Sequence, residues 1–418
     1  MHPRAIISGP LAAQVLAAAR AIAAELAAIE PSDASLRGSS GVWLLFHELG
    51  AAAPAVPRAT ARRWEDAAIA ALPTLDASFF DGMLGCAWLL ALCGRAPAEL
   101  AEVDAAVLDA LGEPWQGGLG AFGGGLAGFG AYGLARLSAR GAGARAGARA
   151  GARAGARAGA QIVRRCAARF AELAHREGRA AWWTPGAASL PAAVRDRPPL
   201  LANREGTAAA VAFLAAAAAI ARPAQGSPLR SSLALARCGA RALVQELARE
   251  TPDRLGVATA RGAPGLVHGS GTWALGGAGA VAALLAVARA TGDLADTARC
   301  ARMLADVEPD LCAVSDASLG TGTAGIACVL QAAAEAAREP TLARAAEHWH
   351  RRTLRCRRPG EGIGGYLHRD ELADAAGGGG RWAPRPGLLE GAAGTALSLL
   401  CAARGARASP WLARCLIA

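Results

Sequence analysis

The side chains with the clearest chemical potential stand next to short glycine-containing steps. Asp81 directly precedes one such step, and Glu390 directly precedes another. Two carboxylates in one cleft are the groups that glycoside hydrolysis requires, so a carbohydrate-active enzyme is one alternative for this chain. Arg204 and Glu205 precede a third step, and Trp273 lies beside a fourth. We expect all five side chains to line a common basin.

The ten cysteines and seven histidines show no metal-binding spacing. Neither Cys-x-x-Cys nor His-Glu-x-x-His occurs, so no standard motif predicts a metal site. Most cysteines fall inside apolar segments with helical periodicity, which predicts buried free thiols and no disulfide framework. His348 and His350 lie beside two arginines, and we expect them on a solvated helix face.

The glycine steps organise the whole chain. Each step has the form Gly-x-x-Gly, with Ala replacing the second glycine in the fourth copy, and each leads into an apolar run. Glycine lets neighbouring helix ends approach closely, and converging helix starts would place N–H groups and positive dipole ends around one basin. The seven copies occupy residues 38–41, 82–85, 125–128, 206–209, 276–279, 322–325 and 391–394.

More charged stretches with apolar residues at helical spacing alternate with the steps. An amphipathic helix has one buried face and one solvent-exposed face, whereas a helix that is apolar on all sides must be buried on all sides. A ring of outer helices around a ring of inner helices meets both needs. We therefore predict an all-α fold, a seven-fold α/α toroid. The predicted outer helices run approximately over 12–29, 62–75, 98–111, 161–176, 231–250, 294–309 and 341–356.

Composition excludes several classes of protein. The chain has 418 residues, 53% of them hydrophobic, so it can bury a large core. The 44 basic residues are all arginines and exceed the 34 acidic residues by 10. Exclusive use of arginine indicates compositional bias, so this net charge gives little support to a nucleic-acid partner. The longest apolar run, Thr207–Ala221, is shorter than a membrane span requires. We expect a cytoplasmic protein with no membrane span and no signal peptide.

We expect a single domain over residues 1–418 with an insertion at 139–160. Within it, residues 143–158 repeat Gly-Ala-Arg-Ala four times. Glycine in every turn and like charges four residues apart both weaken a helix, so we predict a disordered surface segment, with a basic arm as the alternative. A long loop is predicted over residues 358–387, which are rich in glycine and proline.

The chain resembles the lanthionine synthetase C-like family, the cyclases of lanthipeptide biosynthesis. The resemblance covers essentially the full length, since the seven steps match that family's seven-fold double ring. Thr272-Trp-Ala-Leu-Gly-Gly-Ala-Gly279 is similar to its Ser-Trp-Cys-Tyr-Gly-x-Pro-Gly segment. Ser318-Leu-Gly-Thr-Gly-Thr-Ala-Gly325 is similar to its Leu-Cys-His-Gly-x-Ala-Gly segment, and Gly387-Leu-Leu-Glu-Gly-Ala-Ala-Gly394 to its closing repeat.

The resemblance implies a particular chemistry. Cyclases of this family hold one zinc ion with two Cys and one His and leave a position for the substrate. A Cys of the precursor peptide binds as thiolate and adds to a dehydrated Ser or Thr, which forms a thioether ring. Zinc supplies the nucleophile near neutral pH because it lowers the thiol pKa, and an acid then protonates the resulting enolate.

This sequence departs from the family at those positions. The first Cys ligand falls on Ala274, and the adjacent Cys-His pair falls on Gly320 and Thr321. Two further functional positions of the family, a His and an Asp, fall on Glu205 and near Ala121. Alanine and glycine offer no donor and threonine is a poor zinc ligand, so we expect no zinc and no other cofactor.

The leading interpretation is a zinc-less pseudo-cyclase that binds a precursor peptide or a partner synthetase, with a dehydratase as a further possible partner. The alternative is an active thioether-forming cyclase with relocated zinc ligands. His268, Cys312 and an acid such as Glu205 are the candidates for that set.

Overall fold

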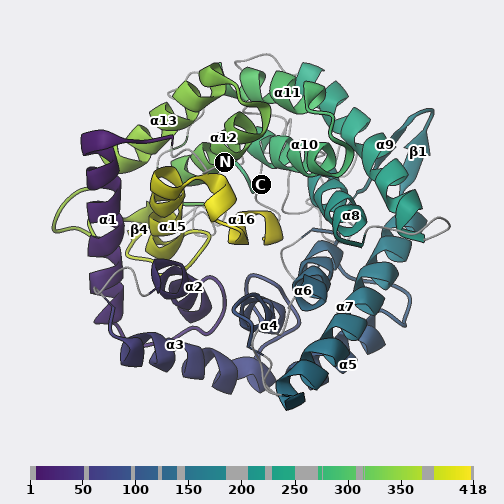
Figure 1. Cartoon of the computed structure of the whole chain (residues 1–418), viewed down its shortest axis with the longest axis horizontal. Helices are drawn as coiled ribbons and strands as arrows, with labels where there is room; N and C mark the ends of the chain where they lie inside the picture. The colour runs from purple at the N-terminus through teal and green to yellow at the C-terminus, as the bar shows by residue number, and fades with distance from the viewer. Residues whose placement is uncertain are drawn as a thin grey trace.

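The computed structural model describes residues 6–50, 56–95, 99–120, 125–138, 146–184, 206–221, 228–249, 272–274, 276–306, 314, 316–369 and 381–415. Its described part is mainly helical and forms a closed double ring (Figure 1). The prediction of an all-α, seven-fold α/α toroid is confirmed.

Seven apolar helices form the inner ring, and each begins within one of the glycine steps. Their buried faces are nearly continuous, as in α4, where every residue from Leu84 to Ala91 is buried. Each packs against the next around the ring, and the last packs against the first. These helices are α2 (Ser39–Leu49), α4 (Met83–Leu92), α6 (Leu126–Ser138), α8 (Thr207–Ala221), α10 (Gly277–Thr291), α12 (Thr323–Ala337) and α15 (Ala392–Arg404).

The outer helices are amphipathic and cover the inner ring. In α13, for example, the buried side carries Leu342, Ala346 and Trp349, whereas Arg351 and Arg355 lie on other sides of the helix. The first outer helix, α1, packs against the last inner helix, α15, so the two ends of the chain close the ring (Figure 1). The outer helices are α1 (Gly9–Ala27), α3 (Arg58–Ala71), α5 (Glu99–Ala110), α7 (Ala146–Glu172), α9 (Pro228–Arg249), α11 (Ala295–Ala305) and α13 (Pro340–Arg355).

The second glycine of a step is required by close approach of the main chain. A Cβ atom on Gly394 would collide with the carbonyl oxygen of Leu388, and one on Gly325 would collide with the carbonyl oxygen of Leu319. In both cases the obstacle is the loop that leads into the same helix. The step therefore lets each inner helix start directly against its own preceding loop, at the end of the ring where the loops gather.

The prediction of a disordered segment over 139–160 is wrong for the residues that the structure describes there. Residues 146–160 belong to α7, while 139–145 lie outside the described residues. Two glycines of the Gly-Ala-Arg-Ala repeat explain the helix, because Gly155 faces the Arg136 guanidinium and Gly159 faces the main chain of α6. Close packing on α6 thus outweighs the low helix propensity of glycine. Arg153 and Arg157 are exposed.

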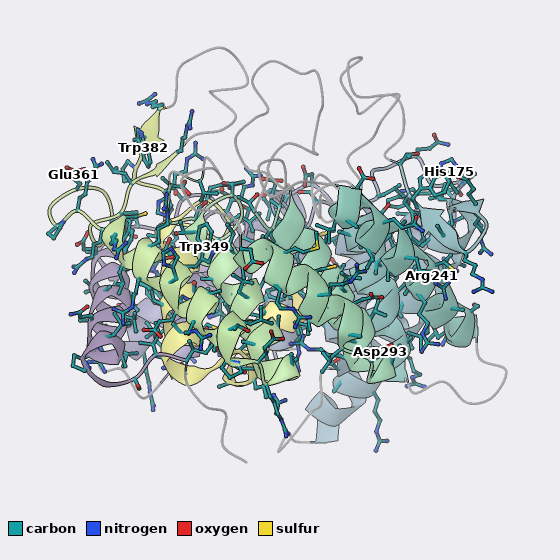
Figure 2. All side chains as sticks on the ribbon, turned by 90° about the horizontal axis from the view of Figure 1, so that it is seen from above. His175, Arg241, Asp293, Trp349, Glu361 and Trp382 are labelled. Carbon is teal, nitrogen blue, oxygen red and sulfur yellow. The ribbon has the colours of Figure 1, made fainter. Side chains whose placement is uncertain are left out.

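Two short antiparallel strand pairs interrupt the helices. β1 (His175–Glu177) pairs with β2 (Ala180–Trp182), and β3 (His368–Arg369) pairs with β4 (Trp382–Ala383). The second pair lies within the predicted loop at 358–387, of which 370–380 lie outside the described residues. Both pairs precede inner helices, and in the side view His175 and Trp382 lie towards the same face of the ring (Figure 2). The 3-10 turns η2 (Leu72–Thr74) and η5 (Ala406–Ala408) and the short helix α16 (Trp411–Arg414) complete the described elements.

Several smaller expectations can be compared with the structure. Nine cysteines are described, all as free thiols, and six of them are buried; Cys312 lies outside the described residues.

His350 is fully buried, so its predicted place on a solvated face is wrong, because it lies on the side of α13 that faces the inner ring. Within the described residues, α1 alone is long and apolar enough to cross a membrane, and 33% of that apolar window is buried in the ring.

The packing of α7 on α6 predicts opposite effects for two glycines of the same repeat. A Cβ on Gly159 would lie 2.6 Å from the Leu137 nitrogen and 2.7 Å from the Gly133 oxygen, whereas Gly151 has open space around it. We expect Gly159→Ala to lower the free energy of unfolding by about 1–3 kcal/mol. Gly151→Ala should raise it by about 0.5–1 kcal/mol through helix propensity. Denaturant unfolding followed by circular dichroism measures both, and equal effects would contradict the packing.

Candidate functional site

The three positions that the sequence resemblance assigns to zinc ligands lie close together at the end of the ring where the inner helices begin, which we call the mouth. They lie in the loops that lead into α10 and α12. The backbone N–H of Ala274 donates a hydrogen bond to the Gly320 carbonyl at 2.9 Å, and Thr321 is the next residue along the chain. The N–H of Gly320 in turn donates to the Leu389 carbonyl at 2.8 Å, before α15. Main-chain hydrogen bonds between neighbouring repeats therefore hold this part of the mouth together.

The same kind of bond continues into the first two repeats. The N–H of Leu388 donates to the Leu36 carbonyl at 2.8 Å, and the N–H of Arg37 donates to the Phe80 carbonyl at 3.3 Å. Five loops of the ring, those before α10, α12, α15, α2 and α4, are thus joined in order by backbone contacts. We call this run of loops the mouth belt. Because main-chain atoms form it, the mouth belt places few demands on side-chain identity.

The side chains at the three positions do not fit a zinc ion. Ala274 is 3% exposed and presents only a methyl group, and Gly320 has no side chain. The Thr321 hydroxyl lies 3.2 Å from the Ser318 hydroxyl, which donates to the Asp316 carboxylate at 2.8 Å. Zinc sites in proteins use thiolate, imidazole and carboxylate ligands. Among the residues that the structure describes, no group of three His, Cys, Asp or Glu side chains is arranged to hold a metal.

Asp-Ala-Ser occurs three times in the mouth belt, a motif that the sequence analysis did not single out. In each copy the Asp carboxylate accepts the backbone N–H of the Ser two residues later, at 2.9–3.0 Å. The Asp carbonyl also accepts an N–H from the first residue of the following helix, as with Met83 at 2.7 Å and Thr323 at 3.0 Å. These helix starts are capped by their own loops. The three copies are residues 33–35, 76–78 and 316–318.

Arg37 brings together the two carboxylates that the sequence places far apart. Its guanidinium lies 2.8 Å from Asp81 and 3.3 Å from Glu390, so one cation bridges the loops of three repeats. The Arg37 and Glu390 side chains are 18% and 17% exposed, and Asp81 is 42% exposed. Both acids were predicted as site residues from the sequence, whereas Arg37 was not. The pair proposed for glycoside hydrolysis is thus engaged with one guanidinium.

Trp273 is fully buried, which corrects the expectation that it lines an open basin. Its ring meets the Phe80 ring edge to face, with the centroids 6.0 Å apart. The contact links the fifth repeat to the second across the mouth. Five other predicted site residues lie outside the described residues: Ala121, Arg204, Glu205, His268 and Cys312.

His368 is a buried polar residue near the mouth that sequence analysis missed. Its Nε2 lies 3.1 Å from the Thr395 hydroxyl, which donates to the Ala317 carbonyl at 2.8 Å. Burial lowers the pKa of His368 to about 4; Asp316 opposes this shift, and Arg385 adds to it. The imidazole therefore joins the loop before α12 to α15 in its neutral form. Only the pairing of β3 with β4 marks this position, and a two-residue strand leaves no signal in sequence.

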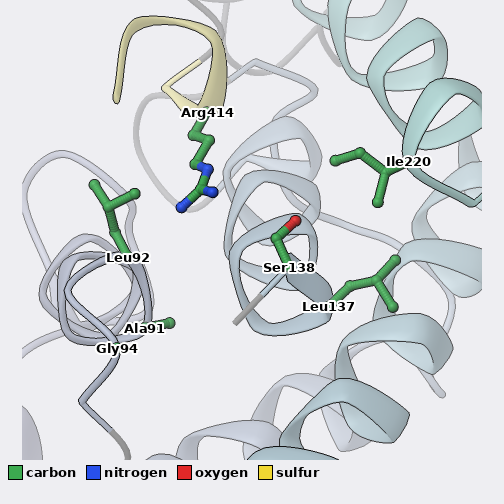
Figure 3. Close-up of a pocket in the computed structure, with 7 residues that line it drawn as sticks. All are labelled: Ala91, Leu92, Gly94, Leu137, Ser138, Ile220 and Arg414. Carbon is green, nitrogen blue, oxygen red and sulfur yellow. The ribbon is translucent and has the colours of Figure 1, made fainter. Parts of the chain in front are cut away.

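A separate cavity of about 630 Å³ lies at the other ends of the inner helices (Figure 3). The final residues of α4, α6 and α8 contribute to its wall, including Leu92, Ser138 and Ile220. Arg414 of α16 points into it. Each of these wall segments continues into residues outside the described part of the chain. This cavity is distinct from the mouth, where the glycine steps begin the helices.

Comparison with known proteins gives a structural match. No protein-family model matches the sequence, and no curated protein matches it. A solved structure described as nisin cyclase superimposes with a TM-score of 0.62, covering 94% of this chain and 94% of that chain at 14% sequence identity. At this identity the match establishes the shared helical toroid.

The bridging position of Arg37 predicts that its loss destabilises the mouth. Arg37→Ala leaves two partly buried carboxylates without their guanidinium, and we expect the free energy of unfolding to fall by about 1–3 kcal/mol. Arg351→Ala is the matched control, because its i,i+4 pair with Glu347 is solvent-exposed and contributes at most about 0.5 kcal/mol. Denaturant unfolding of both variants tests this. Equal losses would show that the bridge has no special role.

Because burial keeps His368 neutral in the folded chain, we expect the free energy of unfolding to fall at acid pH. The unfolded chain protonates this histidine near pH 6.5, whereas the folded chain resists protonation down to about pH 4. Its contribution to stability is complete above about pH 6.5 and is lost as the pH falls towards 4, by up to about 1.4 kcal/mol per pH unit. His368→Gln should flatten the stability profile in this interval, as measured by urea unfolding between pH 8 and 4.5. Exposed His348→Gln is the matched control, and an unchanged slope in His368→Gln would contradict the assignment.

Proposed function

We propose that this chain is a lanthionine synthetase C-like protein that binds a lanthipeptide precursor, or a partner synthetase, without zinc catalysis. One observation carries the proposal. Ala274, Gly320 and Thr321 meet at the mouth of the ring, yet they bear none of the side chains that hold zinc. The similarity in fold to nisin cyclase over 94% of the chain supports a role in the same kind of biosynthesis.

The mouth provides the features that a peptide-binding protein needs. The mouth belt is a preorganised main-chain frame, so little conformational entropy is lost when a ligand binds against it. Arg37, Asp81 and Glu390 give the mouth both signs of charge on partly exposed side chains. In this proposal the chain acts in the cytoplasm and holds the precursor while a dehydratase or another synthetase modifies it.

The alternative function is an active cyclase with relocated zinc ligands, drawn from His268, Cys312 and Glu205. It differs from the proposal in metal content and in the fate of peptide thiols. An active cyclase consumes one free thiol for each thioether ring, whereas a binding protein consumes none. Measurements of bound zinc and of free peptide thiols therefore distinguish the two functions.

Metal analysis of the purified chain provides the first test. We expect well below one zinc per chain in the wild type by plasma mass spectrometry. Ala274→Cys, Gly320→Cys and Thr321→His together should raise this to about one, because a Cβ on Gly320 would meet only the Leu389 side chain and carbonyl at 3.5 Å. Ser, Ser and Asn at the same three positions make the matched control without thiolate or imidazole. Stoichiometric zinc in the wild type, lost on His268→Ala or Cys312→Ala, would overturn the proposal in favour of relocated ligands.

Peptide binding provides the second test. The probe is a synthetic peptide rich in Cys, Ser and Thr, with its Ser and Thr residues dehydrated and a fluorophore attached. We expect saturable binding by fluorescence anisotropy and no loss of peptide thiols to alkylation over hours. Arg37→Ala should weaken binding several-fold, with Arg351→Ala as the control. Absence of binding, or thiol loss catalysed by the wild type, would contradict the proposed role.

A further inference from the structure

A cavity of about 390 Å³ lies at the end of the ring opposite the mouth. Its walls come from the last turns of α10 and α12 and from the turn η5. In the side view Asp293, which directly follows the cavity residue Gly292, lies well away from Trp382 and His175 (Figure 2). The cavity size falls within the usual range for small-molecule sites. The uncharged lining consists of Ala288, Gly292, Leu294, Ala332, Ala336 and Ala406.

Glu335 is the acidic residue among the lining residues, and protein groups already occupy its oxygens. One oxygen accepts the backbone N–H of Ala406 at 2.6 Å and the side-chain amide of Gln331 at 3.1 Å. The other accepts the backbone N–H of Arg407 at 3.1 Å. Three donors therefore hold this carboxylate against the wall, and its role there is to fix η5 to α12.

Two arginines line the same cavity. Neither the Arg289 nor the Arg407 guanidinium makes a hydrogen bond or an ion pair with any residue that the structure describes, and much of each side chain is exposed. Desolvation by the wall lowers the pKa of Arg289; Glu335 opposes this change, and the nearby charge of Arg407 adds to it. Arginine side chains carry a positive charge in proteins. With Glu335 included, the cavity carries a net charge of +1.

We propose that this cavity binds a carboxylate that carries a short aliphatic body, either as a free acid or as the C-terminal residue of a peptide. A guanidinium can donate two parallel hydrogen bonds to one carboxylate, so Arg289 and Arg407 favour a ligand with a carboxylate group. Alanines and a leucine form the remaining surface, which is suited to a few methylene groups and to no second charge. This inference is independent of the function proposed for the mouth.

Hydrogen bonds between protein groups fix the wall that carries Arg407 in the absence of a ligand. His350 donates from Nε2 to the Gln331 side-chain oxygen at 2.8 Å, and the Gln331 amide donates to the Cys401 carbonyl at 2.9 Å and to Glu335. This buried chain connects α13, α12, α15 and η5. Because its members are already ordered, ligand binding costs little reorganisation of the wall.

Isothermal titration calorimetry with three named probes tests the proposal on the full chain. The probes are hexanoate, N-acetyl-alanyl-leucine and its C-terminal amide, which lacks the carboxylate. We expect saturable binding of at least one acid and at least ten-fold weaker binding of the amide. Tighter binding of hexanoate would identify the free acid as the source, and tighter binding of the dipeptide would identify a peptide terminus. Equal binding of amide and acid, or no binding of either acid at millimolar concentration, would overturn the proposal.

Two variants locate the site. Arg289→Ala and Arg407→Ala should each weaken binding of the acid about ten-fold or more, because a charge-assisted bond is lost. Arg299→Ala is the matched control, since this exposed arginine of α11 pairs with Asp296 away from the cavity. Thermal midpoints within about 2 °C of the wild type would show that all three variants are folded. Binding that survives both cavity variants would refute the assignment of the site.

Discussion

The ring depends on main-chain contact at the point where each inner helix begins. At Gly325 and Gly394 the missing Cβ leaves room for a carbonyl oxygen of the preceding loop, and any larger residue would push the loop away. These loops are also the segments that hydrogen-bond from one repeat to the next in the mouth belt. A displaced loop would therefore disturb its neighbours as well as its own helix, which makes the glycine steps a condition for closing the ring.

This constraint separates the requirements of the fold from those of the chemistry. The contact between Ala274 and Gly320 uses an N–H and a carbonyl, which every residue except proline supplies. Side chains at the mouth can change while the ring persists. A toroid that superimposes on nisin cyclase at 14% identity is consistent with such freedom. Substitution of side chains at the mouth without a change of fold is the kind of change that this architecture permits.

Sequence predicted the elements well and the site only in part. The alternation of apolar and amphipathic helices follows from burial alone, so all seven pairs could be predicted from the pattern of hydrophobic residues. The helical part of the Gly-Ala-Arg-Ala repeat was missed because its stability comes from α6, which local propensity does not describe. Arg37 was missed for a similar reason, since its partners Asp81 and Glu390 are neighbours only after the ring closes. Repetition of Asp-Ala-Ser was visible in the sequence and would have revealed the capped loops.

The pairing of α1 with α15 has a consequence for how the protein is made. α1 precedes α15 by more than 350 residues in the chain, so the buried side of α1, with Val15, Ile22 and Leu26, is translated long before the helix on which it packs. Before α15 is translated, α1 lacks the helix against which it packs in the folded ring. The apolar side of α1 is therefore exposed in the nascent chain until α15 has been made, which makes it a site for aggregation or for binding of a chaperone.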